Sequence, residues 1–99
     1  MITVDPEFIF RGRPAMAIAP ETRDAMENYV NLGLPPGHFL TGIICKDLEM
    51  CMCHADANNL WLIPLIYAWF YNEAPAGCWG DKETMKAWID RKGKNSPCP

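Results

Sequence analysis

The sequence lacks the segments that direct a chain to a membrane or out of the cell. Its first eight residues, MITVDPEF, have neither the basic start nor the apolar stretch of a secretory signal peptide, so we expect a cytoplasmic protein. The longest apolar run covers residues 60–71 and would span roughly 18 Å as a helix, well short of the ~30 Å hydrocarbon layer of a bilayer. We therefore interpret this run as a core helix rather than a membrane anchor.

The sequence also has few basic residues and lacks the cysteine spacing of a structural zinc site. The net charge of −3 argues against a general nucleic-acid-binding protein, which needs a clustered basic surface. The 5 cysteines are an odd number, and Cys51-x-Cys53-His54 lacks the C-x₂-C spacing of structural zinc sites. On a helix Cys51 and Cys53 would point to opposite sides, although Cys51 and His54 could share one face. We expect free thiols, no bound metal and no cofactor.

Catalytic motifs are missing as well. The sequence contains no P-loop, no glycine-rich dinucleotide-binding motif, no H-E-x-x-H and no G-x-S-x-G. Cys53 and His54 are sequence neighbours, whereas a nucleophile and its base normally come from distant parts of the chain. We therefore predict that the protein is not an enzyme.

The apolar and turn-forming residues predict a small, mainly α-helical single domain with an extended N-terminal arm. Pro20 and Gly33 mark the start and end of a first helix, and Asp56 and Asp81 are good N-caps for two later ones. The predicted helices cover residues 20–32, 37–54, about 56–72 and 81–93. The predicted organisation is an arm, a helical domain and a flexible tail, over residues 1–19, 20–93 and 94–99.

The central run, LWLIPLIYAWFY at residues 60–71, has no polar face, even though Pro64 disfavours a straight helix there. A helix that is hydrophobic all round must be buried in a core or against a partner. Three short amphipathic helices are too few to surround it completely. We therefore predict a homo-oligomer, most simply a dimer formed through part of this helix.

The best polar candidate site follows this run, where Tyr71, Asn72 and Glu73 precede a glycine loop that contains Trp79. One interpretation is structural, namely a helix end followed by a tryptophan that packs on the core. The other is functional, because an exposed tryptophan beside an amide and a carboxylate can hold a base or a sugar by stacking and hydrogen bonding.

Two further places could contact an anion. His38 follows the Pro-Pro-Gly corner, where free backbone N–H groups at a helix start attract negative charge. Arg11 and Arg13 flank Gly12 and form either a solvated turn or a phosphate contact. The sequence alone leaves both alternatives open.

Several motifs resemble small proteins encoded by tailed bacteriophages and prophages, over about residues 20–90. The most specific are PPGxFL and YNEAPxGxWG, accompanied by Asp47-Leu48, Ala55-Asp56-x-x-Asn59 and Lys86-Ala87-Trp88-Ile89. The chain departs from that pattern at Lys46, where asparagine is expected, and at the cysteine-rich segment 51–54. The resemblance brings no established activity and no functional residues.

The resemblance implies a context in the host cytoplasm. We expect a non-enzymatic accessory protein that counters host defence or metabolism by stoichiometric binding, for example by sequestering a nucleotide-like signalling molecule. The alternative is an inhibitor that blocks a host protein through its acidic and aromatic surface. A third possibility is a structural or regulatory component of the phage.

Overall fold

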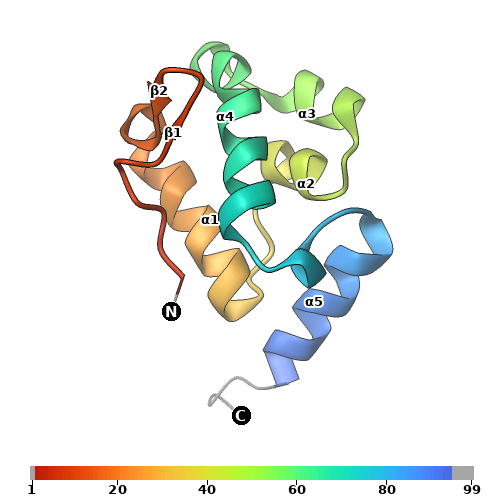
Figure 1. The fold of residues 1–99 in the computed structure, drawn as a ribbon. Helices are drawn as coiled ribbons and strands as arrows, with labels where there is room; N and C mark the ends of the chain where they lie inside the picture. Colours follow the sequence, from red (N-terminus) through yellow and green to blue (C-terminus); the bar gives the residue numbers. More distant parts are fainter. Residues whose placement is uncertain (1, 95–99) are drawn as a thin grey trace.

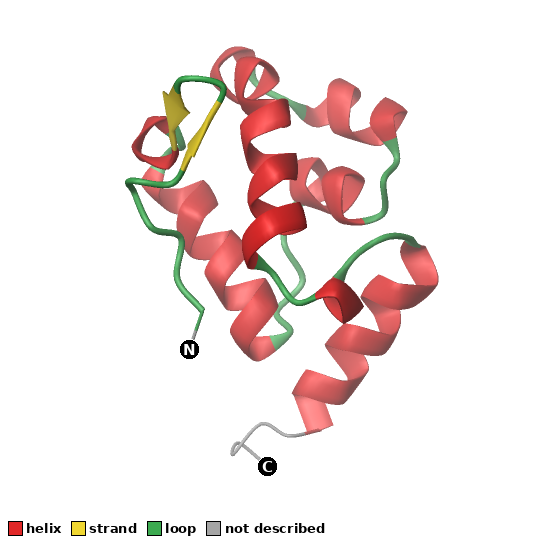
Figure 2. Ribbon diagram, viewed as in Figure 1, coloured by secondary structure: helices red, strands yellow, loops and turns green. Residues whose placement is uncertain are grey.

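One long helix, α4 (Ala57–Glu73), runs through the middle of the structure, and the other elements lie around it (Figure 1). The computed structural model describes residues 2–94. The remaining α-helices are α1 (Pro20–Leu32), α2 (His38–Ile44), α3 (Leu48–His54) and α5 (Lys82–Lys94). Short elements complete the fold, namely strands β1 (Ile9–Phe10) and β2 (Arg13–Pro14) and the 3₁₀ turns η1 (Ala15–Ala17) and η2 (Ala76–Cys78) (Figure 2).

The predicted mainly helical single domain is confirmed, and two of its helices have the predicted ends. Helix α1 begins at Pro20 and ends before Gly33, which takes a left-handed conformation (φ 69°) and donates its N–H to the Tyr29 carbonyl at 2.9 Å. Helix α4 begins after Asp56, whose Oδ1 accepts the backbone N–H of Asn59 at 2.7 Å. It continues through Pro64, whose side chain faces outward.

The prediction of one helix over residues 37–54 is wrong, because the chain turns back after α2. Lys46 adopts a left-handed φ of 57°, and Asp47 caps α3 by accepting the N–H of Met50 at 3.1 Å. The resulting α2–α3 hairpin packs so closely that a Cβ on Gly42 would lie 2.5 Å from the backbone nitrogen of Cys51. The described chain therefore has five α-helices where the sequence pattern predicts four.

The N-terminal arm lies on the chain's own helices. Strands β1 and β2 pair antiparallel across Arg11 and Gly12, both with positive φ (51° and 79°), as in the primed turns that match the twist of a hairpin. Nearer the start of the chain, the N–H of Val4 donates to Glu27 at 2.7 Å and the N–H of Ile2 donates to Asn31 at 2.9 Å. Side chains of α1 thus hold the arm in place.

The core forms between α4 and the elements that surround it. Tyr29 connects three of these elements, since its hydroxyl donates to the Cys78 carbonyl at 2.5 Å and its own carbonyl accepts from Trp88 Nε1 at 3.1 Å. Trp79 folds back onto the core, as one interpretation of the sequence predicts. The largest fully buried side chains include Trp69, Phe70, Ile66, Leu65, Tyr29 and Met26.

The last helix, α5, starts after Asp81 as predicted and ends at Lys94, one residue beyond the predicted end at residue 93. The predicted flexible tail over 94–99 lies outside the described residues, apart from Lys94 at the end of α5. Within residues 2–94, no helix has the length and apolar character needed to cross a membrane.

Candidate functional site

A hollow of about 480 Å³ lies between the α2–α3 hairpin and α5, two parts of the chain that adjoin each other in Figure 1. We call it the α5 groove. Its lining comes from the hairpin and from one face of α5, and comprises Thr41, Cys45, Asp47, Met50, Lys82, Met85, Lys86 and Ile89.

Two local interactions place α5 against the hairpin. The N–H of Gly80 donates to the carbonyl of Ile44 at 2.7 Å, which ties the loop before α5 to the end of α2. Asp81 then caps α5 by accepting the N–H of Thr84 at 2.7 Å. This hydrogen bond stabilises the carboxylate and lowers the pKa of Asp81.

The inner wall of the groove is rich in sulfur, and its one thiol has low reactivity. The Cys45 thiol lies 3.6 Å from the Met85 sulfur. Burial raises the pKa of Cys45, the negative charges of Asp47 and Asp81 raise it further, and Lys82 opposes them. Because the thiolate is the reactive form, a thiol with a raised pKa is a poor nucleophile.

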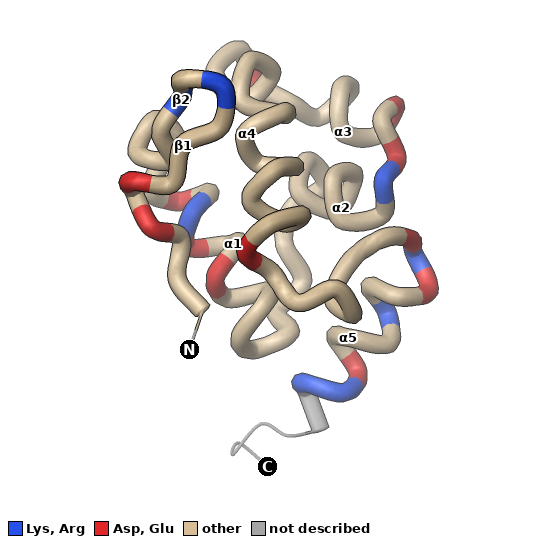
Figure 3. Tube along the Cα trace, in the orientation of Figure 1, with Lys and Arg blue, Asp and Glu red and all other residues tan. Residues whose placement is uncertain are grey.

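The rim of the groove carries charge of both signs. Lys82 and Lys86 are four residues apart and therefore lie on the same face of α5. Asp47 stands on the opposite wall at the start of α3. Acidic and basic positions alternate along this part of the chain (Figure 3). An apolar wall below two ammonium groups suits a ligand with one flat apolar part and one anionic part.

The structure separates Trp79 from the polar residues with which the sequence grouped it. The Trp79 side chain is 9% exposed, with ring centroids 4.8 Å from Tyr67 and 5.6 Å from Phe70. The ammonium of Lys46 lies 4.8 Å from the centroid of the Trp79 ring. The structural interpretation therefore agrees with the structure, and the expectation of an exposed stacking surface at Trp79 is wrong.

Tyr71, Asn72 and Glu73 lie instead at the end of α4, all exposed. Tyr71 and Asn72 line a second hollow, of about 330 Å³, together with Phe10. The amide nitrogen of Asn72 donates to the Ala68 carbonyl within the same helix at 2.9 Å, so part of its bonding capacity is already used.

The other predicted anion contacts lie elsewhere. His38 stacks on His54 at the open end of the α2–α3 hairpin, with ring centroids 4.9 Å apart. Arg11 and Arg13 line a hollow of about 220 Å³ beside Trp61, and the Arg11 guanidinium lies 5.3 Å from the Phe10 ring centroid. The seven predicted site residues thus do not form one site.

The cysteine-rich segment behaves as its helical spacing predicts. Cys51 is buried and Cys53 is exposed, so the two side chains lie on opposite sides of α3. Burial raises the pKa of Cys51. Within residues 2–94, no three His, Cys, Asp or Glu side chains come together in a way that could hold a metal ion.

Sequence reasoning did not find the α5 groove. The spacing of Lys82 and Lys86 is visible in the sequence, but lysines four residues apart are ordinary on the outer face of a helix. Comparison of the chain with protein-family models, with curated proteins and with solved structures finds no match.

Proposed function

We propose that this protein is a non-catalytic binding protein that captures a small ligand in the α5 groove. The observation that carries this proposal is a hollow of about 480 Å³ whose apolar wall stands below Lys82 and Lys86. This volume falls within the range of about 300–1,000 Å³ that is common for small-molecule sites.

A nucleotide-like molecule suits the distribution of groups in the groove. A base can lie against Met50, Met85 and Ile89, because sulfur and methyl groups pack well against aromatic rings. Its phosphate can meet the ammonium groups of Lys82 and Lys86, which act as point charges for phosphate. The Asp47 carboxylate on the opposite wall can accept a hydrogen bond from an amino group of the base.

The raised pKa of Cys45 supports capture without chemistry, because the one sulfur nucleophile that lines the groove stays protonated. With the resemblance to small phage proteins, this leads us to propose stoichiometric sequestration in the host cytoplasm, directed against host defence or metabolism. In this proposal the ligand is held intact and returned unchanged.

The alternative function is an inhibitor that blocks a host protein. The observation that favours it is the aromatic surface of α4, where Trp61 is 69% exposed and Tyr71 is 72% exposed. Exposed rings of this kind are typical anchors in protein interfaces. A host protein and a second copy of this chain would compete for that surface.

The test uses a panel of mono-, di- and cyclic nucleotides and measures the melting temperature of the protein with each. A ligand present at about 100 times its Kd should stabilise the protein by about 2.7 kcal/mol, which is readily measured in a domain of this size. Heat denaturation should then release the bound nucleotide unchanged. A panel that leaves the melting temperature constant, together with one host protein in a pull-down, would instead favour the inhibitor.

The matched variants reverse charge on two sides of the same helix. Lys82→Glu with Lys86→Glu should weaken nucleotide binding at least tenfold, since two attractive charges become repulsive. Arg91→Glu with Lys92→Glu makes the same change in net charge, at residues that lie over the Trp88 ring rather than in the groove. Equal losses of affinity in both pairs would indicate a non-specific charge effect and contradict the proposed site.

A further inference from the structure

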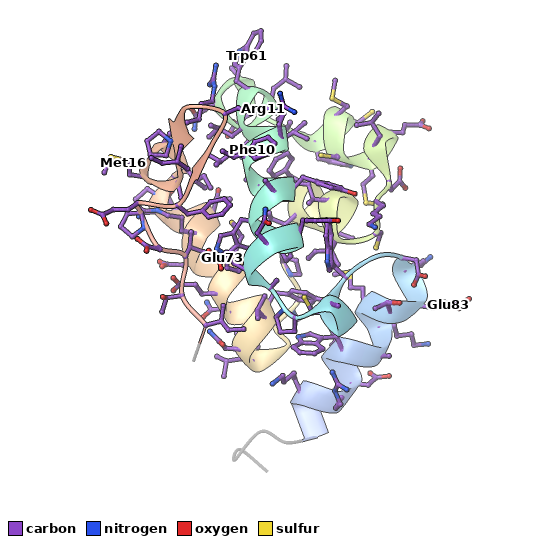
Figure 4. All side chains as sticks on the ribbon, viewed as in Figure 1. Phe10, Arg11, Met16, Trp61, Glu73 and Glu83 are labelled. Atoms are coloured by element: carbon purple, nitrogen blue, oxygen red, sulfur yellow. The ribbon has the colours of Figure 1, made fainter. Side chains whose placement is uncertain are left out.

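Sulfur-containing side chains are concentrated in one part of the structure. The segment 45–53, which forms the turn and the second helix of the α2–α3 hairpin, contains three cysteines and two methionines. In Figure 4 the yellow sulfur atoms gather around this hairpin. Two of these residues, Cys45 and Met50, line the α5 groove, and α5 adds Met85 from the opposite side. One thiol and two thioethers therefore border a single hollow.

The spacing of two of these sulfur atoms suits a shared metal ion. Cys45 Sγ and Met85 Sδ lie 3.6 Å apart. A transition-metal ion lies about 2.3 Å from a thiolate sulfur, so an ion held by both atoms would have a sulfur–metal–sulfur angle of about 100°. This angle is close to the tetrahedral one and leaves room for a third ligand. Met50 can supply it, because the three rotatable bonds of a methionine let its sulfur adapt to its surroundings.

The types of ligand indicate which metal the three sulfur atoms would hold. Zinc is bound in proteins by thiolate, imidazole and carboxylate groups, and thioethers are not among its usual ligands. Thiolate and thioether sulfurs together are soft ligands that favour Cu(I). The search for groups of His, Cys, Asp and Glu within residues 2–94 does not cover this case, because two of the three ligands are methionines.

The charges around Cys45 favour a cation on the inner wall. Burial and the negative charges of Asp47 and Asp81 raise the pKa of this thiol, and Lys82 opposes them. The negative charges that disfavour a thiolate attract a positive ion, which replaces the thiol proton when it binds to the sulfur. The Cys45 side chain is only half-buried, so an ion can reach it from the groove.

We propose that Cys45, Met50 and Met85 form a binding site for one Cu(I) ion on the inner wall of the α5 groove. Binding releases the Cys45 proton to the solvent and leaves the oxidation states of copper and sulfur unchanged. This inference goes beyond the proposed capture of a nucleotide and does not depend on it, because the nucleotide phosphate uses Lys82 and Lys86 at the rim.

The experiment is an oxygen-free titration of the full chain with Cu(I), in competition with the coloured Cu(I) chelator bicinchoninate. The protein carries Cys53→Ser and Cys98→Ser, which remove the exposed thiol of α3 and a thiol that lies outside the described residues. This reference protein should bind one Cu(I) per chain. Because one proton leaves for each ion bound, its affinity should rise about tenfold for each pH unit between about pH 6 and about pH 8.

Single substitutions in the reference protein assign the ligands. Cys45→Ser should weaken Cu(I) binding at least a hundredfold and remove its pH dependence, since the thiolate is the strongest ligand. Met50→Leu and Met85→Leu should each weaken binding at least tenfold, because leucine keeps a similar volume and lacks the sulfur. Met52→Leu is the matched control, since Met52 is 48% exposed on α3 and does not line the groove.

Circular dichroism of each variant shows whether a loss of affinity comes from a loss of the fold. Met50 is half-buried, whereas Met85 is 8% exposed, so Met50→Leu tests the site even if Met85→Leu disturbs the packing of α5. The nucleotide panel, measured without copper, tests the proposed function separately. Failure of the copper site and failure of nucleotide capture are thus distinguishable.

Three results would overturn the proposal. One is a reference protein that leaves all the Cu(I) with the chelator. Another is a Cys45→Ser variant that keeps its affinity, which would assign the ion to the buried thiols of Cys51 or Cys78. The third is an affinity that both Met50→Leu and Met85→Leu leave unchanged, which would show that a single thiolate binds the ion without a built site.

Discussion

The two faces of α4 have nearly the same composition and opposite environments. The inward face buries Leu65, Ile66 and Trp69 completely, whereas the outward face leaves Trp61 and Tyr71 largely open to solvent. Helix α2, turn η1 and strand β1 all contact α4, but they leave one side of it uncovered. The apolar character of residues 60–71 thus places the segment at the centre of the fold. Which side is buried depends on where the rest of the chain lies.

Aromatic residues also have different roles on the two faces of α4. Inside, Trp69 and Phe70 meet edge to face, with ring centroids 5.1 Å apart, and fill the core. Outside, the rings have a polar edge that tolerates water while their flat surfaces remain available to a partner. The same residue types therefore stabilise the fold on one face and offer a contact surface on the other.

The most direct test of whether the two faces differ is to truncate one tryptophan on each face. Trp69→Ala should lower the free energy of unfolding by about 3–5 kcal/mol, because it leaves a large cavity in the core. Trp61→Ala should cost within about 0.5 kcal/mol, as is usual for exposed positions. Urea unfolding at low protein concentration measures both, since dilution removes any contribution from self-association.

A conservative variant sharpens this test. The Trp69 indole N–H is buried and has no hydrogen-bond partner, and an unsatisfied buried donor costs about 1–3 kcal/mol. Trp69→Phe removes that donor together with part of the ring, so it should destabilise the protein far less than Trp69→Ala. If Trp61→Ala proved as costly as Trp69→Ala, the two faces would be energetically alike and the comparison would fail.

The features that the sequence predicts correctly are those that depend on interactions between residues close together in the chain. The starts of α1, α4 and α5 were predicted because each depends on a local signal, namely Pro20, Asp56 and Asp81, which acts within one helical turn. The break between α2 and α3 was missed because the apolar spacing continues across it. It is stabilised by the approach of Gly42 to Cys51, a contact that exists only after the hairpin has formed.

The candidate site was harder to predict for the same reason. Trp79 was correctly expected to fold back on the core, yet its partners Tyr67 and Phe70 come from another helix. The α5 groove exists because the loop before α5 returns to the end of α2 through the Gly80 to Ile44 hydrogen bond. Lys82 and Lys86 carry no sequence signal that distinguishes them from ordinary surface lysines.

A second prediction concerns Pro64, the residue on the outward face of α4 that is least compatible with a regular helix. Pro64 cannot donate a backbone hydrogen bond, and in a helix interior proline is less favourable than alanine by about 3 kcal/mol. The gain on replacing it is reduced by the greater freedom of the unfolded chain, which costs about 1 kcal/mol. Pro64→Ala should therefore raise the free energy of unfolding by about 1–2 kcal/mol.

Denaturant unfolding checks this sign directly. A destabilised Pro64→Ala variant would mean that the proline ring makes necessary packing contacts, and the outward face would then be part of the core after all.

The smallest expected effect is a change in stability with pH, to which the apolar side chains of α4 do not contribute. The Asp81 carboxylate accepts the N–H of Thr84, and this bond lowers its pKa below the ordinary value of 3.8. A group whose pKa is lower in the folded state stabilises the protein above its unfolded pKa, and this contribution disappears as the pH falls through the folded pKa.

The measurement compares melting temperatures of the wild type and Asp81→Asn from neutral pH down to about pH 3, which includes the unfolded pKa of an aspartate. Asparagine also caps a helix but does not titrate there, so the variant keeps the cap and loses only the charge. The wild type should therefore lose its small advantage at the acid end, where the two melting temperatures converge. Parallel profiles would show that the Asp81 charge contributes nothing to the start of α5. The placement of α5 would then depend on packing and on uncharged hydrogen bonds such as the one from Gly80 to Ile44.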